Sequence, residues 1–352
     1  MRAYAETLMA AFADHAPDVV PELVELNPTP MKGVWGPRLQ TVLMPARAWL
    51  QRNRKPDLWH VLDGSRAYIA RALAPAPVVI TAHDIIPWLQ ANGRFPGSPP
   101  IGGAAARLWQ RNGREMRRAA GLVCVSECTA RDTLQDLGCV PEIVRVVPNP
   151  LRPGMADRAC AAIDVIRSGG VVLHVGNNGF YKNREGVLRI FAKLDPSIAC
   201  RLLMAGPAPT VELLRLAQEH GLADRIEWCG DPDDDALASL YRRASVLLFP
   251  SLYEGFGWPV LEAMAFGLPV VASDAGSLSE VIGAAGVCLP LDDEAGFVSA
   301  INRILGSRET AIDLTKRGLA RAGEFGASVF AKRMQEAYLA AIATQQRTAI
   351  DE

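Results

Sequence analysis

The sequence SLYEGFGWPVLEAMAFG, residues Ser251–Gly267, follows an apolar run that ends at Pro250. The run is typical of a buried strand. A helix is expected to begin near Pro259, since a proline in the first helical turn loses no hydrogen bond. Two glycines in the connecting loop let the backbone N–H groups of residues 255–257 point at a ligand, where the helix dipole also favours negative charge. The stretch therefore predicts an anion site at the carboxyl end of a strand.

Two carboxylates flank this predicted anion site. Glu254 lies in the loop, and Glu262 lies eight residues later in the first turns of the helix. A carboxylate accepts two hydrogen bonds at once, so it suits the paired hydroxyls of a sugar. A phosphate site with polyol sites on either side fits a nucleotide sugar. The alternative interpretation makes Glu254 a solvated loop charge and Glu262 a partner of the helix dipole.

The second half of the chain alternates short apolar runs with amphipathic segments. The runs lack the two-residue alternation of half-exposed strands, which is typical of strands buried on both faces of a parallel sheet. Helices are expected between them, for example over 211–220 and 258–266, each followed by a glycine that stops the helix. We therefore predict an α/β fold with a doubly wound sheet. The expected strands are 171–176, 201–206, 225–230, 245–250, 269–273 and 286–290.

The first half of the chain shows the same alternation of apolar runs and amphipathic segments, with fewer expected strands. A Pro-rich joint over Val147–Gly154 separates the halves; its prolines stiffen the chain and its glycine allows a turn. We expect Rossmann-like domains over 1–150 and 155–325. A last helical segment, within 326–352, packs on either domain and could cross back to the first. The expected strands of the first half are 59–62, 77–82, 122–126 and 143–147.

The beginning of the chain departs from the usual order of a doubly wound domain. Tyr4–Ala13 has the pattern of an amphipathic helix, and the sequence before it is too short for a strand. We expect either that the first domain lacks its first strand or that the true start of the protein lies upstream of Met1.

Composition narrows the class of protein. The 352 residues are 49% hydrophobic, which suffices for two domains, and the net charge of −1 gives no overall attraction to nucleic acid. Residues 1–150 carry 17 Lys and Arg against 13 Asp and Glu, whereas the rest carries 20 against 25, so the halves differ in sign. There is no run of 18 apolar residues, and the seven cysteines lack the spacing of a zinc site. We therefore expect a cytoplasmic protein with reduced thiols and no metal.

The spacing of Glu254 and Glu262 resembles the E-x7-E signature of the retaining glycosyltransferases of family 4, also called group 1, which have the GT-B fold. The resemblance implies two Rossmann-like domains that face each other across a cleft, with an acceptor domain over 1–150 and a nucleotide-sugar domain over 155–325. It also implies sugar transfer from a nucleotide diphosphate sugar, with retained configuration and without a metal or other cofactor. Further matching segments are Lys182-Asn183, Ala205–Pro207, Leu247–Phe249, Gly267–Ser273, Glu280–Ile282, and, more loosely, His83-Asp84 and Ser126–Thr129.

The resemblance implies roles for individual residues. Glu262 would hold the ribose hydroxyls, Glu254 would lie by the donor sugar, and Lys182 would bind the phosphates. A lysine and a helix N-terminus there would stabilise the charge that develops on a leaving diphosphate. Lys182 is alternatively a solvated loop lysine. The donor-binding residues implied are Asn177, Lys182, Asn183, Gly255, Phe256, Gly257 and Glu262.

One position departs from the family pattern. Many members have arginine directly after the glycine that corresponds to Gly176, whereas this chain has Asn177. Arg184 is the candidate replacement, although its place after Lys182-Asn183 leaves its direction open. Whether a second cation binds the diphosphate is therefore not decided by the sequence.

His83 follows the expected strand 77–82, at the end where open α/β sheets bind ligands. The resemblance implies that it faces the donor sugar and that Asp84 orients it, which makes His83, Glu254 and Lys182 the predicted catalytic residues. The alternative interpretation is a satisfied core histidine. No nucleophile is evident, so both a covalent intermediate and same-face attack are open. We favour same-face attack, because Glu254 and Glu262 are both expected to contact the donor.

A basic helix is expected in the first half. Arg107, Arg111, Arg114 and Arg118 share one helical face with Leu108 and Trp109 alongside, and a second basic segment lies over 47–55. Such a helix suits an anionic membrane surface, which would bring the protein to the inner face of the plasma membrane. An ordinary solvated helix face is an equal alternative, and nucleic acid is disfavoured.

The sequence narrows the choice of donor sugar and acceptor without fixing either. His83-Asp84 followed by Ile-Ile-Pro resembles enzymes of bacterial surface polysaccharide synthesis, lipopolysaccharide included, which favours GDP-mannose and a glycan or lipid-linked acceptor. UDP-glucose and UDP-N-acetylglucosamine stay open as donors. The alternatives are an epimerase or a phosphorolytic enzyme on the same fold, or a non-catalytic, truncated sugar-nucleotide-binding protein.

Overall fold

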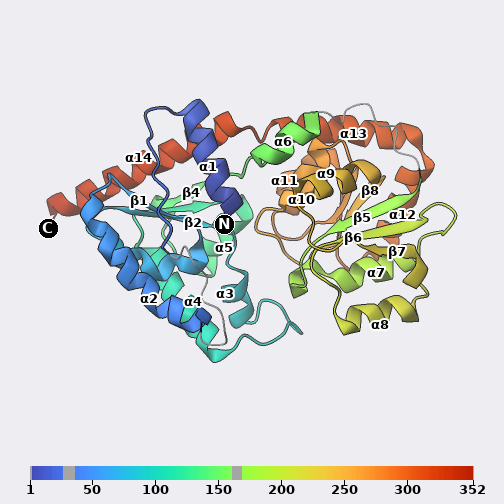
Figure 1. Cartoon of the computed structure of the whole chain (residues 1–352), viewed down its shortest axis with the longest axis horizontal. Coiled ribbons are helices and arrows are strands. Elements are labelled where there is room, and N and C mark those ends of the chain that lie inside the picture. Colours follow the sequence, from blue (N-terminus) through green and yellow to red (C-terminus); the bar gives the residue numbers. More distant parts are fainter. Residues whose placement is uncertain (1, 27–35, 161–168, 352) are drawn as a thin grey trace. The chain divides into compact units, whose positions relative to one another are not determined.

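The computed structural model describes residues 2–26, 36–160 and 169–351 (Figure 1). The chain divides into two compact units. The first unit comprises residues 1–148 and 327–352, and the second comprises residues 149–326. The division falls within the Pro-rich joint, and the C-terminal helix belongs to the first unit.

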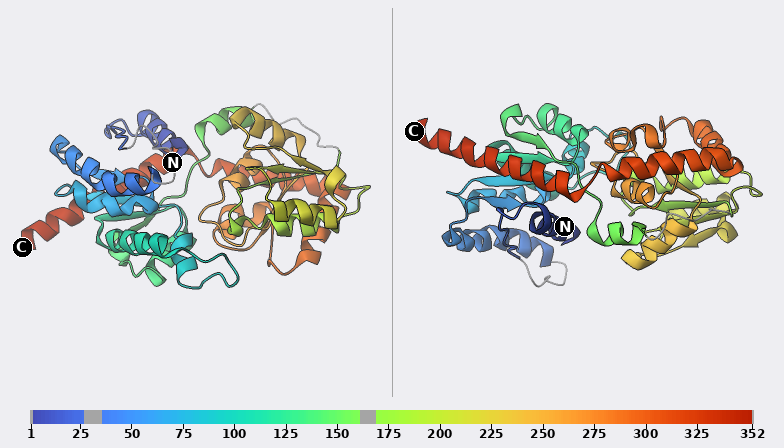
Figure 2. Two further views of the ribbon diagram at one scale, coloured as in Figure 1. Left: turned by 60° about the horizontal axis from the view of Figure 1, so that its bottom comes forward. Right: turned by 90° about the horizontal axis from the view of Figure 1, so that it is seen from above.

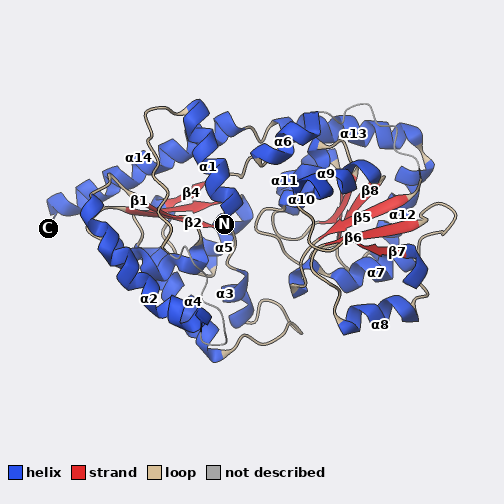
Figure 3. Cartoon of the chain, in the orientation of Figure 1, coloured by secondary structure: helices blue, strands red, loops and turns tan. Residues whose placement is uncertain are grey.

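The first unit is built on a four-stranded parallel sheet in the order β1-β2-β3-β4. Strands β2 and β3 are buried along their whole length, as their apolar sequences require. Helices surround the strands (Figure 3). The elements are α1 (Arg2–His15), α2 (Gly36–Gln51), β1 (Trp59–Val61), β2 (Val78–Ala82), α3 (Ile86–Ala91), α4 (Gly103–Arg118), β3 (Gly121–Cys124), α5 (Glu127–Gln135), β4 (Val144–Val146) and α14 (Ala327–Asp351).

Helix α14 completes the first unit from the far end of the sequence. It packs against α1, β2 and β3, and Figure 2 shows it running along this unit. Gly121 at the start of β3 allows the close approach, because a Cβ there would lie 3.2 Å from the Cβ of Ala341. Ala337 and Ala341 are buried. Small residues on both sides therefore bring this helix against the sheet.

The second unit contains a six-stranded parallel sheet in the order β10-β9-β8-β5-β6-β7. Counted from its first strand, this is the order of a Rossmann fold. The strands are β5 (Val171–Val175), β6 (Arg201–Ala205), β7 (Ile226–Trp228), β8 (Val246–Phe249), β9 (Val270–Ser273) and β10 (Val287–Leu289). The helices are α6 (Pro153–Cys160), α7 (Arg184–Ala192), α8 (Val211–Glu219), α9 (Asp234–Arg243), α10 (Trp258–Ala265), α11 (Leu278–Ile282), α12 (Glu294–Gly306) and α13 (Arg308–Gly323).

Helices cover both faces of the second sheet. On one face, α7, α8 and α12 pack against alternate strand residues in one apolar cluster that includes Phe191 and Phe297. On the other face lie α9 and α10, which contact β5, β8 and β9. Burial on both faces explains why these strands have continuous apolar sequences instead of alternating ones.

The strand order reverses between β5 and β8, which are parallel neighbours in space although they are not consecutive strands. The loops that leave the carboxyl ends of β5 and β8 therefore diverge to opposite faces. A doubly wound sheet binds its ligands at such a switch point. These two loops carry Lys182 and Glu254.

The strands predicted from the sequence are confirmed to within two residues at each end. The helix expected at the start of the chain is α1, and β1 is the first strand among the residues that the structure describes. The helical segment expected within 326–352 is α14, which extends over Ala327–Asp351. The cysteines whose side chains are described are free thiols, and Cys160 lies outside the described side chains.

Gly206 allows the loop after β6 to pass close to the loop after β5. Its φ is +135°, and a Cβ at this position would lie 2.1 Å from the carbonyl oxygen of Gly176. A side chain would thus require both a disfavoured backbone conformation and displacement of backbone atoms. The close packing of these two loops depends on this glycine.

We predict that Gly206→Ala lowers the free energy of unfolding by about 2–4 kcal/mol, because strain and a backbone clash add together. Gly221→Ala is the matched control: its φ is also positive, at +66°, but nothing lies within 4 Å of the new Cβ. This control should cost only about 1 kcal/mol. Urea unfolding curves of the two variants measure the difference, and equal shifts of the midpoint would contradict the role assigned to Gly206.

Candidate functional site

Lys182 and Glu254 form a buried ion pair at the switch point of the second sheet. Lys182 ends the short 3₁₀ helix η4 (Phe180–Lys182) after β5, and Glu254 lies in the loop after β8. Lys182 Nζ lies 2.7 Å from Glu254 Oε1, and their side chains are 11% and 8% exposed. Because an ion pair strengthens as water is excluded, this contact holds the two loops together.

Asn183 fixes the position of the neighbouring Lys182. It adopts the left-handed conformation, with φ of 49°, and caps α7 by accepting from Gly186 N at 3.1 Å. Its Nδ2 donates to Pro250 O at the end of β8, at 2.8 Å. Leu252 N also donates to Tyr181 O, at 2.7 Å. The side chain of Asn183, predicted as donor-binding, thus caps a helix and ties the β5 loop to the β8 loop.

The backbone of Glu254 is held from a third loop, the one after β9. Ser277 N and Ser277 Oγ both donate to Glu254 O, at 3.1 Å each. Gly276 passes directly beside Glu254, since a Cβ at Gly276 would lie 2.6 Å from Glu254 N. Glu254 is therefore held in both its main chain and its side chain.

Helix α10 begins where the sequence predicts. Gly257 has a φ of +94° and precedes the first residue of the helix, and Pro259 lies in the first turn. Phe256 is buried against Phe325, with ring centroids 5.8 Å apart. The glycines turn the chain sharply so that residues 255–257 precede the positive end of the helix dipole.

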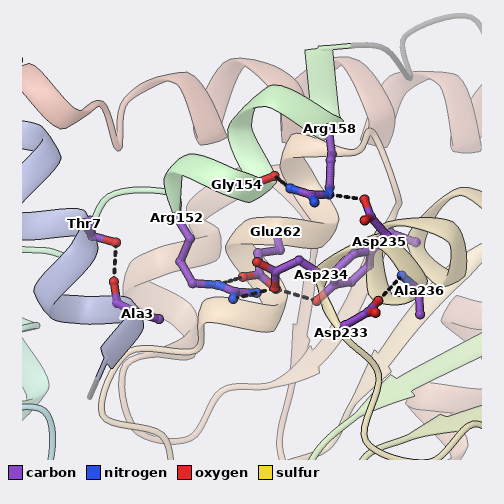
Figure 4. A network of polar contacts seen from close by, with 11 residues as sticks. Ala3, Thr7, Arg152, Gly154, Arg158, Asp233, Asp234, Asp235, Ala236 and Glu262 are labelled. Atoms are coloured by element: carbon purple, nitrogen blue, oxygen red, sulfur yellow. Dashed lines mark hydrogen bonds and ion pairs between the residues drawn. The ribbon is translucent and has the colours of Figure 1, made fainter.

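Glu262 lies inside a network of polar contacts (Figure 4). Its carboxylate accepts from Arg152 Nε at 2.6 Å through Oε1 and from Tyr241 OH at 2.9 Å through Oε2. Arg152 Nη1 also donates to Asp234 Oδ1 at 2.9 Å. Burial raises the pKa of Glu262, and the Arg152 guanidinium opposes that rise. Arg152 and Tyr241 were not identified from the sequence, because Arg152 belongs to the joint interpreted as a hinge.

The loop between β5 and α7 is ordered by its asparagines and Arg184. Asn177 Oδ1 accepts from Gly179 N at 2.8 Å, and Asn178 Nδ2 donates to Ala208 O at 2.9 Å. Arg184 is buried; it contacts Asn178 and donates to Pro207 O at 3.0 Å. Burial lowers the pKa of Arg184. Arg184 therefore joins the loops after β5 and β6.

His83 lies in the first unit, directly after β2. Its Nε2 lies 3.0 Å from Leu62 O, and its ring meets Tyr4 edge-on with centroids 4.6 Å apart. Burial lowers the pKa of His83, so its imidazole is neutral at pH 7. Asp84 Oδ1 accepts from Ile86 N at 2.9 Å at the start of α3. Orientation of His83 by Asp84 stays a prediction.

A buried polar network next to His83 was not predicted from the sequence. His60 Nε2 lies 2.7 Å from Thr81 Oγ1, and His60 Nδ1 lies 2.7 Å from Tyr338 OH on α14. Tyr4 OH reaches the same Thr81 hydroxyl at 3.3 Å. Burial lowers the pKa of His60 to about 3. These groups link α1, β1, β2 and α14, and no local pattern marks them because Tyr338 is far away in sequence.

The predicted basic face of α4 is exposed. Arg107, Arg111, Arg114 and Arg118 are all exposed, and the Arg111 guanidinium lies 5.7 Å from the centre of the Tyr68 ring. Among the described residues, no helix has the length and apolar character needed to cross a membrane. Within the same residues, no three His, Cys, Asp or Glu side chains are grouped so that they could hold a metal ion.

The strand order and the ion pair at the switch point place this chain among the doubly wound α/β proteins, which bind their ligands at that edge of the sheet. Two family models match the chain: one described as glycosyl transferases group 1, over residues 166–321, and one described as Glycosyltransferase Family 4, over residues 5–153. The chain belongs to the group 1 glycosyltransferases.

The individual relatives that match are only moderately similar to this chain in sequence. The chain is 32% identical over 246 residues to the MMP alpha-(1->4)-mannosyltransferase of Mycolicibacterium hassiacum, which covers 63% of this chain and 57% of that enzyme. It is 28% identical to the D-inositol 3-phosphate glycosyltransferase of Nocardia farcinica, and this match covers 96% of the present chain and 80% of that enzyme. It is 34% identical over 160 residues to O-antigen chain mannosyltransferase B of Escherichia coli. This match covers 44% of the present chain and 42% of that enzyme. The match thus spans little more than half of the first relative and less than half of the third.

Solved structures share the fold. Sucrose-phosphate synthase from Thermosynechococcus elongatus matches with a TM-score of 0.74 at 22% identity, covering 95% of this chain and 92% of that one. Anabaena Alr3699/HepE, solved with UDP and glucose, matches with a TM-score of 0.66 at 20% identity, covering 88% of this chain and 83% of that one. WaaG, described as a glycosyltransferase involved in lipopolysaccharide biosynthesis, matches with a TM-score of 0.69 at 14% identity, covering 96% and 94%. The predicted family and GT-B fold class are confirmed.

We predict that Lys182→Met destabilises the protein by about 3 kcal/mol or more, because it leaves the Glu254 carboxylate buried without a cation. The double variant Lys182→Met, Glu254→Gln should recover most of that loss, since neither charge is left unpaired. Urea unfolding of the two single variants and the double variant measures the coupling. Additive losses would show that the two side chains do not depend on each other.

Proposed function

We propose that this chain is a retaining hexosyltransferase that uses a nucleoside diphosphate sugar as donor. The observation that carries the proposal is the Lys182–Glu254 pair at the switch point, with Glu262 eight residues further on in α10. Membership in the glycosyltransferase family supports the reaction class. The positions of these three groups support binding of an anion with hydroxyl groups on either side.

In this proposal, Glu262 accepts hydrogen bonds from the ribose, and Glu254 contacts the donor sugar. Lys182 and the N-terminus of α10 bind the diphosphate, whose negative charge grows as the bond to the sugar breaks. Because Lys182 and Glu254 are fixed by the surrounding loops, they need little rearrangement in the transition state. A cationic side chain and a helix N-terminus supply the positive charge that a metal supplies elsewhere, so we propose a metal-independent reaction without a cofactor.

We propose same-face attack for the transfer step. The acceptor oxygen forms a bond to the anomeric carbon, the bond to the diphosphate oxygen breaks, and the acceptor proton passes to the leaving phosphate. The ion pair of Glu254 with Lys182 supports this route over nucleophilic attack by the carboxylate, since a paired carboxylate is a weaker nucleophile. In this proposal His83 acts on the donor sugar, and Asp84 orients it.

The donor sugar we propose is mannose, carried as GDP-mannose. Relatives named as mannosyltransferases support this choice, two of them named for O-antigen or serotype-specific synthesis. A relative named 2-deoxystreptamine glucosyltransferase and a structure solved with UDP and glucose support glucose instead. The acceptor we propose is a glycan or a lipid-linked glycan of a bacterial surface polysaccharide such as lipopolysaccharide.

We propose that the enzyme works in the cytoplasm at the inner face of the plasma membrane. The exposed arginines 107, 111, 114 and 118 of α4 support electrostatic contact with anionic lipid. Such contact would bring a lipid-linked acceptor to the enzyme and would weaken as the salt concentration rises.

The test of this proposal is calorimetric titration with GDP and UDP, together with hydrolysis of GDP-mannose, UDP-glucose and UDP-N-acetylglucosamine. We predict that Glu262→Ala weakens nucleoside diphosphate binding at least tenfold, because it removes the ribose partner. Glu254→Gln should change that affinity less than threefold but lower sugar hydrolysis at least a hundredfold.

Glu294→Gln is the control variant. Glu294 pairs with Arg189 and Lys193 at 3.0 and 2.5 Å, so the variant also breaks an ion-pair network in the second unit. It should change neither binding nor hydrolysis. Binding of neither diphosphate, or binding that Glu262→Ala leaves unchanged, would contradict the proposed donor site.

A further inference from the structure

Arg152 connects the beginning of the second unit to Glu262. It lies just before α6 and bridges two carboxylates: Nε donates to Glu262 Oε1 at 2.6 Å, and Nη1 donates to Asp234 Oδ1 at 2.9 Å. The Arg152 side chain is 19% exposed, that of Asp234 is 45% exposed, and that of Glu262 is 2% exposed. Figure 4 shows the guanidinium in contact with both acidic side chains. Arg152 is thus the partner of Glu262 on the solvent side.

The backbone around Arg152 is anchored within the second unit. Trp258 Nε1 at the start of α10 donates to Pro150 O at 3.1 Å, and Leu151 N donates to Phe325 O at 3.3 Å. These contacts fix the main chain beside Glu262, whereas the Arg152 side chain is held by its two carboxylate partners. A change of partner at Arg152 therefore requires only side-chain rotation.

Both oxygens of Glu262 are already engaged in this structure. Oε2 accepts from Tyr241, whose side chain is fully buried, and Oε1 accepts from Arg152. A pair of ribose hydroxyls needs accessible oxygens on this carboxylate, and at 2% exposure it offers almost none. Because Tyr241 has no route to solvent, Arg152 is the group that can move away.

We infer that Arg152 occupies the ribose subsite and that nucleotide binding displaces it from Glu262 onto Asp234. This inference rests on the proposed function. Asp234 already holds Nη1, so the guanidinium keeps one carboxylate partner when it gives up the other. The nucleotide then binds more weakly than the open subsite would allow, because part of its binding energy is used to open it. Arg152 is therefore a positioning residue that tunes affinity for the ribose of the donor.

The inference gives opposite expectations for the two partners of the guanidinium. Arg152→Met removes the occupant and should tighten binding of the nucleoside diphosphate about fivefold. Asp234→Asn removes the group that receives Arg152 and should weaken binding about fivefold. The double variant should behave like Arg152→Met, because Asp234 matters only while the arginine is present.

Calorimetric titration at pH 8 measures these effects, with whichever of GDP and UDP binds the unmodified protein more tightly. The 2′,3′-dideoxy form of the same nucleotide is the second probe. It lacks the ribose hydroxyls, so its affinity should change less than twofold in every variant. A merely structural role of Arg152 would alter both probes alike.

Arg158→Met is the matched control. Arg158 of α6 forms a similar ion pair with Asp235 of α9, at 2.7 Å, but does not contact Glu262. This variant should leave both affinities unchanged. Thermal unfolding of each variant verifies that the second unit is folded.

Two results would overturn the inference, and they can be told apart. If the nucleotide binds in a Glu262-dependent way but Arg152→Met binds it no more tightly, Arg152 does not occupy the subsite, although the donor site stands. If neither GDP nor UDP binds the unmodified protein or Arg152→Met, the donor site itself is wrong.

Discussion

The buried ion pair between Lys182 and Glu254 is the contact on which the site depends. It joins the loops that leave β5 and β8, where the strand order of the second sheet reverses. Water is largely excluded from both side chains, so removal of either partner would leave a buried charge without compensation. The surrounding loops are shaped to keep the pair together: Asn183 ties one loop to β8, and Ser277 holds the backbone of Glu254.

This arrangement explains why several loop residues must be glycine or asparagine. Gly206 and Gly276 pass within van der Waals contact of neighbouring backbone, and Asn183 takes up a left-handed conformation while its side chain caps α7. The result is a fixed arrangement of Lys182 and Glu254 beside the N-terminus of α10 at one edge of the sheet. Preformed polar groups of this kind stabilise a developing charge without reorganisation, which suits departure of a diphosphate.

Much of this could be predicted from the sequence because the signals are local. Continuous apolar runs mark strands buried on both faces, and the spacing of Glu254 and Glu262 places one carboxylate in a loop and one in the following helix. The partners of these groups could not be predicted. Arg152 meets Glu262 across 110 residues, and His60 meets Tyr338 across 278 residues, so only the folded chain brings them together. The capping role of Asn183 depends on a backbone conformation that no sequence pattern specifies.

The most direct test of the central claim is a crystal structure of the protein with the nucleoside diphosphate that it binds. We expect ribose hydroxyls within hydrogen-bond distance of Glu262 and phosphate oxygens beside Lys182 and the N-terminus of α10. A nucleotide bound away from both Glu262 and Lys182, with the Lys182–Glu254 pair untouched, would contradict it.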